Sequence, residues 1–317
     1  MNKYLIETKS LKKYFQTSHG LLHAVDDINF GISEGKTLGV VGESGCGKST
    51  LGRVILQLIP ATAGEVLYKG ENVLNYGKKK LDRIRHEMQI IFQDPYSSLN
   101  PRMTVFELIA DPLIANKSNI RKAEMSECVF ELMERVGLSQ KLVNTYPHEL
   151  DGGRRQRIGI ARALTLKPKF IVCDEPVSAL DVSVQAQILN LLMDLQDSMG
   201  LTYMFITHDL SVVRHISDEI AVLYLGKCVE KAPKRELFSN PIHPYTKALL
   251  SAIMLPSIET RNATIKLIRG EVTSPINPRP GCRFAPRCEF STSRCLEKDI
   301  ELKEVEQNHF VACALQD

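Results

Sequence analysis

The sequence predicts an α/β fold built around a parallel sheet, and three patterns lead to this prediction. A short apolar strand at residues 37–41 runs into a glycine-rich turn, and a helical pattern follows at residues 49–58. Two further apolar runs, at residues 170–173 and 202–206, each end in polar residues, and residues 183–199 between them have a helical pattern. Apolar strands that alternate with helices are typical of a parallel sheet covered on both faces.

Length and composition limit the domain organisation. The chain has 317 residues, of which 44% are hydrophobic and 24% are charged, as in ordinary globular proteins. Because single cores stop growing at about 250 to 300 residues, we expect one main domain with an extension. We place the boundary so that residues 1–254 form the main domain, with a helical insertion at about 95–165, and residues 255–317 form the extension. Four prolines interrupt any long element in that extension: Pro275, Pro278, Pro280 and Pro286.

The charge and hydropathy of the sequence exclude several classes of protein. A formal net charge of +3 is too small to indicate nucleic-acid binding, since the longest basic run is Lys78-Lys79-Lys80, which we interpret as a solvated surface turn. No run approaches the ~20 consecutive apolar residues of a membrane span, and the N-terminus lacks the apolar core of a signal peptide. We therefore expect a cytoplasmic protein that reaches a membrane only through partners.

The glycine-rich turn after the first strand predicts a phosphate-binding site. Residues 42–49 fit the pattern G-x-x-x-x-G-K-[ST] in full and lie between a strand and a helix. The glycines let backbone N–H groups turn toward phosphate oxygens, and the helix N-terminus points its positive dipole end at them. We expect Lys48 to bind the β and γ phosphates and Ser49 to bind Mg²⁺. The predicted nucleoside triphosphate site comprises Gly42, Glu43, Ser44, Gly45, Cys46, Gly47, Lys48, Ser49 and Thr50.

Two adjacent carboxylates follow the buried strand at residues 170–173. Phosphoryl transfer to water needs a second Mg²⁺ ligand and a group that orients or deprotonates the water. We assign Asp174 to the metal and Glu175 to the water, because adjacent residues at a strand end point to different sides. The alternative is that both acids cap the next helix. His208, after the strand at residues 202–206, is expected to sense the γ phosphate.

Further motifs, in order along the chain, resemble those of the ATP-binding subunits of ABC transporters. Gln93 follows an expected strand at residues 89–92, like the glutamine of the family's Q-loop. The other matches are a signature-like loop, a D-loop and a switch histidine, at Leu150-Asp151-Gly152-Gly153-Arg154, Ser178-Ala179-Leu180-Asp181 and His208. The resemblance implies a P-loop NTPase core with a parallel sheet, an N-terminal antiparallel β subdomain, a helical insertion and a small cysteine-rich C-terminal extension.

The resemblance also implies roles for the matched residues. In this family two ATPase domains close head to tail, each ATP lies between one P-loop and the partner's signature loop, and closure drives the membrane subunits. The implied hydrolytic residues are Glu175, His208 and Gln93, and the implied Mg²⁺ ligands are Ser49, Gln93 and Asp174. Further nucleotide contacts are implied for Asp151, Gly152, Gly153 and Asp181. A ring near the N-terminus is implied to stack on adenine, and Phe15 matches its position better than Tyr14, with simple packing as the alternative.

Three segments narrow the resemblance to the oligopeptide, dipeptide and nickel importer subfamily: residues 92–104, His243-Pro244-Tyr245-Thr246 and the cysteine-bearing tail. The implied function is an ATPase that powers a peptide importer from the cytoplasmic face of the membrane. Its implied partners are a second, homologous ATPase, two permeases and, indirectly, an external substrate-binding protein. A nickel or metal-chelate importer stays an alternative, as does a soluble ABC-type ATPase without a transport role.

Asp151 and Arg154 depart from the family's signature loop, which has serine and glutamine there. That serine donates a hydrogen bond to the γ phosphate of the partner's ATP, whereas this phosphate would repel a carboxylate. We therefore expect the site completed by this loop to be weak, and the site with this chain's own P-loop and Glu175 to be active. The alternative is that Arg154 pairs with Asp151 or with phosphate and restores the charge balance.

Four cysteines near the C-terminus follow the spacing C-x5-C-x6-C-x17-C: Cys282, Cys288, Cys295 and Cys313. Disulfides are rare in the cytosol, and four thiolates can hold zinc or an iron–sulfur cluster. The resemblance to tails that can carry a 4Fe–4S cluster favours iron over zinc, and free or paired thiols stay an alternative. Either metal would stabilise a tail too small for a core of its own. We expect the other cysteines to be small buried side chains: Cys46, Cys128, Cys173 and Cys228.

Overall fold

The computed structural model of the chain describes residues 3–116, 120–251, 270 and 273–316. The chain forms two compact units, and each is described by itself below. The first comprises Met1–Ser33, Thr37–Asn75 and Ile206–Asp317, and the second comprises Glu34–Lys36 and Tyr76–Phe205. Strands and helices alternate along the chain, so the predicted α/β class is confirmed. The predicted boundary between residues 254 and 255 lies outside the described residues.

The N-terminal part of the first unit forms an antiparallel sheet in the order β2-β1-β4-β5. Its strands are β1 (Ile6–Thr17), β2 (Gly20–Ile32), β4 (Ala63–Tyr68) and β5 (Glu71–Asn72). Leu11 and Ile28 are opposite each other in the β1–β2 register, and both are fully buried. The predicted antiparallel subdomain is therefore present.

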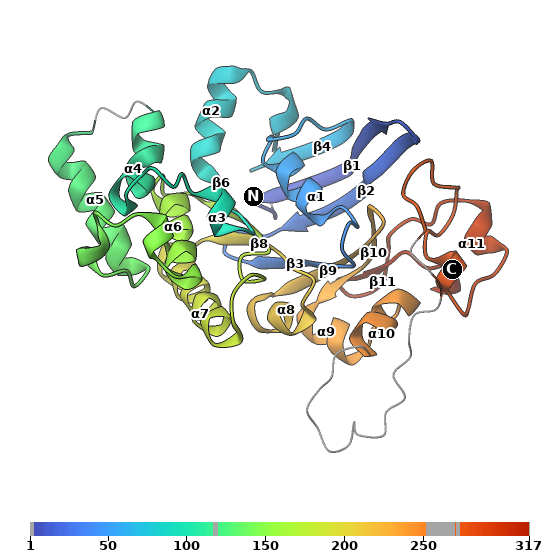
Figure 1. Ribbon diagram of the computed structural model, residues 1–317. Helices are drawn as coiled ribbons and strands as arrows, with labels where there is room; N and C mark the ends of the chain where they lie inside the picture. Colours follow the sequence, from blue (N-terminus) through green and yellow to red (C-terminus); the bar gives the residue numbers. More distant parts are fainter. Residues whose placement is uncertain (1–2, 117–119, 252–269, 271–272, 317) are drawn as a thin grey trace, which may run out of the picture. The chain divides into compact units, whose positions relative to one another are not determined.

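A second sheet of the first unit carries the glycine-rich turn, and its strands follow the order β11-β12-β10-β9-β3. They are β3 (Thr37–Val41), β9 (Glu219–Tyr224), β10 (Lys227–Pro233), β11 (Lys303–Glu306) and β12 (His309–Val311). β3 pairs in parallel with β9, and the other neighbours are antiparallel. The C-terminal segment, residues 273–316 and red in Figure 1, is called the tail from here on, and it thus adds strands beside β10. The helices of this unit are α1 (Lys48–Ile55), α8 (Leu210–Ile216), α9 (Lys234–Ser239), α10 (Pro244–Ser251) and α11 (Arg294–Glu297).

One buried carboxylate fixes the C-terminal segment to β10. Glu230 is fully buried, and it accepts hydrogen bonds from the backbone N–H groups of Ile242 and His243 at 2.8 and 3.0 Å. Its Oε1 also lies 2.7 Å from Nε2 of His309 in β12. Because a buried carboxylate without partners would be strongly unfavourable, these contacts specify where the tail and the segment before α10 lie.

The second unit combines three strands with most of the helices. Its strand order is β8-β7-β6, and β6 and β7 are parallel. The strands are β6 (Met88–Ile91), β7 (Phe170–Asp174) and β8 (Thr202–Ile206). The helices are α2 (Lys78–Glu87), α3 (Pro95–Ser98), α4 (Val105–Ala115), α5 (Lys122–Arg135), α6 (Gly152–Leu164) and α7 (Val182–Met199). Helices α4, α5 and α6 pack together within the predicted insertion, in green in Figure 1.

Short 3₁₀ helices complete both units: η1 (Val73–Asn75), η2 (Gln140–Leu142), η3 (Pro147–Glu149), η5 (Ala285–Arg287) and η6 (Ala314–Gln316). The basic run 78–80 was wrongly predicted as a turn, since it forms the first turn of α2. These lysines are exposed as expected, and the helix buries Ile84 on its other side.

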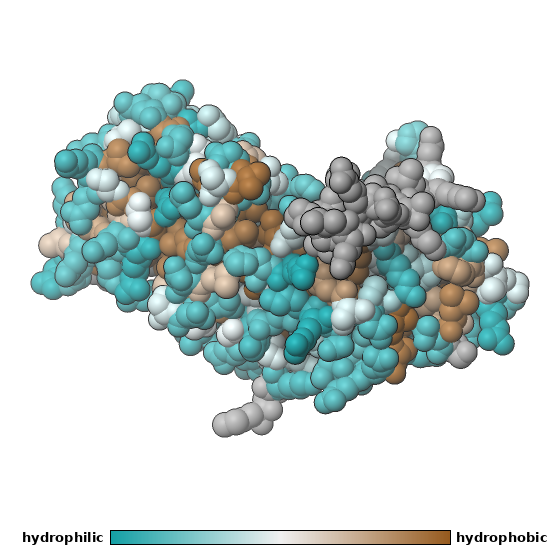
Figure 2. Space-filling view, turned by 90° about the horizontal axis from the view of Figure 1, so that it is seen from below, coloured by the Kyte–Doolittle hydropathy of each residue, from teal (hydrophilic) through white to brown (hydrophobic). Residues whose placement is uncertain are grey.

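Among the described residues, no helix combines the length and hydropathy needed to cross a bilayer. On the face in Figure 2, hydrophilic residues predominate and hydrophobic ones form separate patches.

Gly64 in β4 is expected to tolerate no side chain. Its φ is +90°, and a Cβ built on it would lie 2.2 Å from the carbonyl oxygen of Ser10. Gly64→Ala should therefore lower the free energy of unfolding by about 1–3 kcal/mol, measured by urea denaturation. Gly159→Ala is the control: this glycine lies inside α6, and a Cβ added to it would have no heavy atom within 4 Å, so alanine should raise stability by about 0.5–1 kcal/mol. Equal effects of the two substitutions would contradict the backbone contact.

Candidate functional site

The glycine-rich turn of residues 42–49, called the P-loop from here on, connects β3 to α1 in the first unit. Gly42, Gly45 and Gly47 have φ values of 153°, 76° and 102°. A Cβ at Gly42 would lie 2.1 Å from the carbonyl oxygen of Leu223, and one at Gly47 would lie 1.9 Å from that of Ala24. Glycine is therefore required at both positions, because the loop packs backbone to backbone against β9 and β2.

Lys48 is held by the P-loop itself. Its side chain is buried, and Nζ donates hydrogen bonds to the carbonyl oxygens of Gly42 at 2.8 Å and Glu43 at 3.0 Å. No side chain caps the N-terminus of α1, and its first turn holds no acidic residue. An ammonium group and an uncapped helix N-terminus thus lie together, an arrangement that suits a phosphate group.

Glu43 in the P-loop makes two contacts that local sequence patterns did not predict. Its backbone N–H donates to the hydroxyl of Tyr245 at 3.0 Å, and its carboxylate accepts from Nη1 of Arg287 at 2.9 and 3.2 Å. Tyr245 belongs to the His243-Pro244-Tyr245-Thr246 motif, which was recognised without a role. Local patterns give no sign of the contact with Arg287, since 244 residues separate it from Glu43.

In the second unit, Glu175 and Gln93 come together at the ends of adjacent parallel strands. The register pairs Ile91 of β6 with Cys173 of β7, so both strands end at the same edge. Nε2 of Gln93 donates to Oε2 of Glu175 at 3.1 Å. Glu175 has a φ of +48°, a strained conformation for a residue with a side chain, and Asp174 before it is buried. Strain of this kind is often found at functional sites.

The signature-like loop starts helix α6 of the second unit. Asp151 is the N-cap, and its carboxylate accepts the backbone N–H of Arg154 at 2.8 Å. The Arg154 side chain also pairs with it, with Nε 3.4 Å from Oδ2, so the pairing proposed as an alternative is present. Both side chains are more than half exposed. A Cβ on Gly153 would approach Val184 to 2.7 Å, so the start of α6 packs on α7.

Two other predicted residues lie at helix starts. Asp181 caps α7 by accepting the backbone N–H of Val184 at 3.0 Å, and hydrogen bonds from Ser183 and Val184 lower the pKa of this carboxyl. His208 lies between β8 and α8 in the first unit and is exposed.

The first unit therefore carries the P-loop with Ser44, Ser49 and Thr50, and also His208. The second unit carries Gln93, Asp174, Glu175, Gly152 and Asp181.

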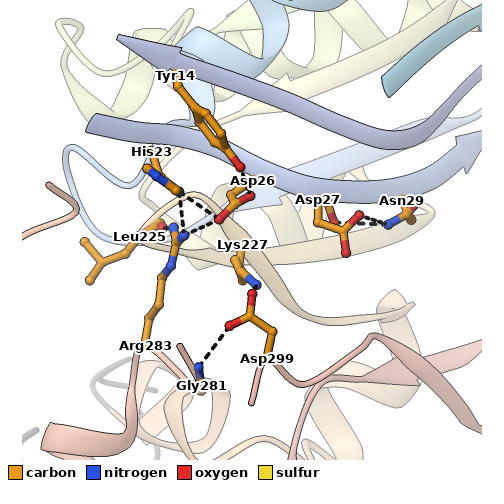
Figure 3. Close-up of polar contacts among 10 residues, drawn as sticks. All are labelled: Tyr14, His23, Asp26, Asp27, Asn29, Leu225, Lys227, Gly281, Arg283 and Asp299. Carbon is orange, nitrogen blue, oxygen red and sulfur yellow. Dashed lines mark hydrogen bonds and ion pairs between the residues drawn. The ribbon is translucent and has the colours of Figure 1, made fainter. Parts of the chain in front are cut away.

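The two candidate adenine-stacking rings are neighbours on β1. The Phe15 ring has Nζ of Lys13 4.7 Å from its centroid. Tyr14 stacks on His23 with 3.9 Å between ring centroids, and its hydroxyl donates to Asp26 at 2.5 Å. Burial raises the pKa of this hydroxyl, and the Asp26 carboxylate raises it further. Figure 3 shows that Tyr14 reaches Asp26, and that His23 and Asp26 both contact Arg283 of the tail. The choice between Phe15 and Tyr14 stays a prediction.

The four C-terminal cysteines line one small pocket. Cys282, Cys288, Cys295 and Cys313 lie around it together with His243, Phe284 and Phe290. All four are free thiols, and burial raises the pKa of Cys282 to about 11. Within the described ranges, no three or more metal-binding side chains are arranged to hold an ion. Cys46, Cys173 and Cys228 are buried as predicted, whereas Cys128 is partly exposed.

Comparison with known proteins identifies the family. The ABC transporter family model matches residues 25–178, and the model for the C-terminal region of oligopeptide/dipeptide transporters matches residues 229–295. The chain is 48% identical over 323 residues to the oligopeptide transport ATP-binding protein AppF of Bacillus subtilis, covering 98% of this chain and 97% of that relative. It is 50% identical over 318 residues to the dipeptide transport ATP-binding protein DppF of Haemophilus influenzae, with coverage of 98% and 97%.

A solved structure gives the same result for the fold. The dimeric ATP-binding cassette MJ0796, in a post-hydrolysis state with ADP and Pi bound, is 30% identical and has a TM-score of 0.67. The match covers 73% of this chain and 99% of that structure. With a P-loop in the first unit, a Gln93–Glu175 pair in the second and relatives matched over nearly their full length, the chain belongs to the ABC transporter family.

Proposed function

We propose that this chain is the ATP-binding and ATP-hydrolysing subunit of a peptide importer, bound peripherally at the cytoplasmic face of a membrane. The P-loop carries the proposal, because its left-handed glycines, buried Lys48 and uncapped α1 form a phosphate site. Peptide as cargo rests on the C-terminal region matched at residues 229–295 and on the relatives named for oligopeptide and dipeptide transport. A nickel or metal-chelate importer is the second candidate.

In the proposed mechanism the P-loop binds the phosphates and Glu175 activates the attacking water. The donor set suits Mg²⁺, which prefers oxygen ligands: the Ser49 hydroxyl, the Asp174 carboxylate and the Gln93 amide oxygen. When bound, Mg²⁺ neutralises charge on the β and γ phosphates. The hydrogen bond from Gln93 keeps the Glu175 carboxylate oriented, and His208 is the proposed sensor of the γ phosphate.

The proposed partners are two permeases and a second, homologous ATPase, with an external substrate-binding protein that delivers the cargo. The helical segment at residues 95–165 is the proposed contact with the permeases. It exposes large apolar side chains, since Tyr96, Ile114 and Tyr146 are 68%, 57% and 39% exposed. Two of these side chains are tyrosines, a residue type that is enriched in protein–protein interfaces, and this supports the proposed contact.

The signature-like loop is the proposed source of asymmetry between the two ATP sites. Asp151 preserves the helix cap that serine would supply, because both are favoured N-cap residues. It replaces a hydroxyl donor with an anion, however, and Arg154 offsets that charge only through an exposed ion pair. The proposal is therefore that the site completed by this loop is weak, and that the partner ATPase completes an active site with this chain's P-loop.

The test of ATP hydrolysis is Glu175→Gln in the assembled importer. We expect the variant to bind ATP while its turnover falls at least about 100-fold, since general acid–base groups contribute that much or more. ATPase rate and peptide uptake into proteoliposomes measure the effect. Glu236→Gln on the exposed side of α9, outside the proposed permease contact, is the control and should be silent. Wild-type turnover in Glu175→Gln would refute the assignment, and uptake of nickel chelates but not peptides would favour the second candidate.

The asymmetry is tested by Asp151→Ser combined with Arg154→Gln. This restores the donor and removes the anion, so the ATPase rate of the heterodimer should rise. The matched control is Asp82→Ser with Arg85→Gln, which removes another exposed ion pair between residues three apart, and should leave the rate unchanged. An unchanged rate in the first variant would contradict the proposal of a weakened site.

The cysteine pocket is the proposed site of a 4Fe–4S cluster, with zinc as the alternative. Four sulfur atoms around one pocket support the proposal, and metal binding would have to displace the proton that burial keeps on Cys282. Binding would also have to bring the thiols into a ligating arrangement, which the described residues do not have. Protein purified without oxygen should contain about four iron atoms per chain and absorb visible light, or about one zinc atom for the alternative. Cys295→Ser should lose the metal, and Cys128→Ser should retain it. Metal-free wild-type protein would contradict both assignments.

A further inference from the structure

Two buried arginines of the tail reach elements of the proposed ATP site. Arg283 follows Cys282 in sequence, and Arg287 precedes Cys288. Their side chains are only 6% and 7% exposed, and each forms an ion pair, Arg283 with Asp26 of β2 and Arg287 with Glu43 of the P-loop. Buried charges of this kind persist only when they are paired, so each arginine is committed to its partner.

Arg287 is fixed by more than its ion pair with Glu43. Its Nη1 lies 2.9 and 3.2 Å from the two carboxylate oxygens and donates to the hydroxyl of Tyr224 at 3.2 Å. The Glu43 side chain is 25% exposed, so solvent screens this pair only partly. The pair therefore determines where the Glu43 carboxylate points.

The position of Glu43 matters because its peptide group also holds Lys48. The carbonyl oxygen of Glu43 accepts from Nζ of Lys48 at 3.0 Å, and its N–H is bound by Tyr245. A carboxylate in a loop that holds a triphosphate raises the local negative charge unless a cation neutralises it. Arg287 supplies that cation and holds the Glu43 carboxylate against the tail.

Arg283 makes a second connection, drawn in Figure 3. It donates to Asp26 and to the carbonyl oxygen of Leu225, and Asp26 in turn accepts from Tyr14. The backbone N–H of Asp26 donates to the carbonyl oxygen of Gly226 at 2.8 Å. The backbone N–H of Gly226 in turn donates to the carbonyl oxygen of Cys46 in the P-loop at 2.9 Å. The tail thus contacts β2 and the turn that supports the P-loop.

The segment that carries both arginines is itself anchored. Phe284 is buried and packs edge-on against Tyr224, and at a tilt against Tyr245, with 5.3 Å between ring centroids in each case. Gly281 N–H donates to Asp299 at 2.9 Å, and Asp299 pairs with Lys227 of β10, as Figure 3 shows. Arg283 and Arg287 are therefore presented from a rigid base.

We propose that the tail is part of the ATP-binding apparatus, with Arg287 as a positioning residue that neutralises and orients Glu43 of the P-loop. Arg287 acts through Glu43 and Lys48 and does not contact the nucleotide. The proposal rests on the proposed function of the P-loop. It gives the C-terminal region a role in nucleotide affinity, in addition to any metal that its cysteines hold.

The test is Arg287→Gln in the full-length chain, assembled with its partners. We expect the KM for ATP to rise roughly tenfold, the size of a typical coupling between sites, while kcat changes less than about twofold. Binding of a fluorescent ATP analogue should weaken by a similar factor. Arg294→Gln, which removes an exposed arginine from the same tail, is the matched control and should leave KM unchanged.

A second substitution separates charge neutralisation from simple structural support. Glu43→Gln in the Arg287→Gln background removes the unpaired carboxylate and should recover most of the lost affinity. If Arg287→Gln fails to fold, Arg287→Lys serves instead: it keeps the charge but not the planar guanidinium, and should give a smaller KM increase.

Two results would overturn the proposal: an unchanged KM in folded Arg287→Gln, or a double variant that binds ATP as poorly as Arg287→Gln alone. Lys48→Ala distinguishes this failure from failure of the proposed function. If Lys48→Ala abolishes ATP binding but Arg287→Gln has no effect, only the role of the tail is wrong. If wild-type protein binds no ATP, the proposed function itself is wrong.

Discussion

The phosphate site depends on one constraint, the backbone packing of the P-loop against the strands beside it. Gly42 and Gly47 leave no room for a Cβ against the carbonyl oxygens of Leu223 and Ala24. The loop therefore keeps its shape only while β9 and β2 stay in place on either side of it. β9 is in turn held by β10, and β10 pairs with β12 from the C-terminal segment. A phosphate site of a few residues is thus supported by chain segments from both ends of the protein.

Much of the fold could be predicted from the sequence because its strands are short apolar runs bounded by polar motifs. The strands at residues 37–41 and 202–206 have the predicted limits, and the strand at 170–173 extends by one residue to Asp174. The helix at 78–87 was missed because three lysines precede the apolar Leu81 and Ile84, so the helical period begins only after the basic run. Strands β11 and β12 have only four and three residues, too few for a pattern that distinguishes a strand from a loop.

The local motifs of the candidate site were also predictable, and its long-range support was not. A P-loop can be read from eight consecutive residues, and the Gln93–Glu175 pair follows from two parallel strands that end at one edge. Arg287 and Glu43, which form an ion pair, are separated by 244 positions in the sequence. Glu230 and His309, which are also in contact, are separated by 79 positions. Such contacts depend on how the tail folds back onto β10. Periodicity and spacing carry no information about that, and a recognised motif such as His243-Pro244-Tyr245-Thr246 gains a role only when its partner Glu43 is seen.

In the proposed function, this chain powers a membrane importer together with a different ATPase. The most direct measurement is to tag the chain, solubilise native membranes gently and identify the co-purifying proteins by mass spectrometry. The proposed function predicts two permeases and a second, different ATPase in the recovered complex. Recovery of soluble partners alone, or of this chain as a homodimer without permeases, would contradict the claim and favour an ABC-type ATPase with no role in transport.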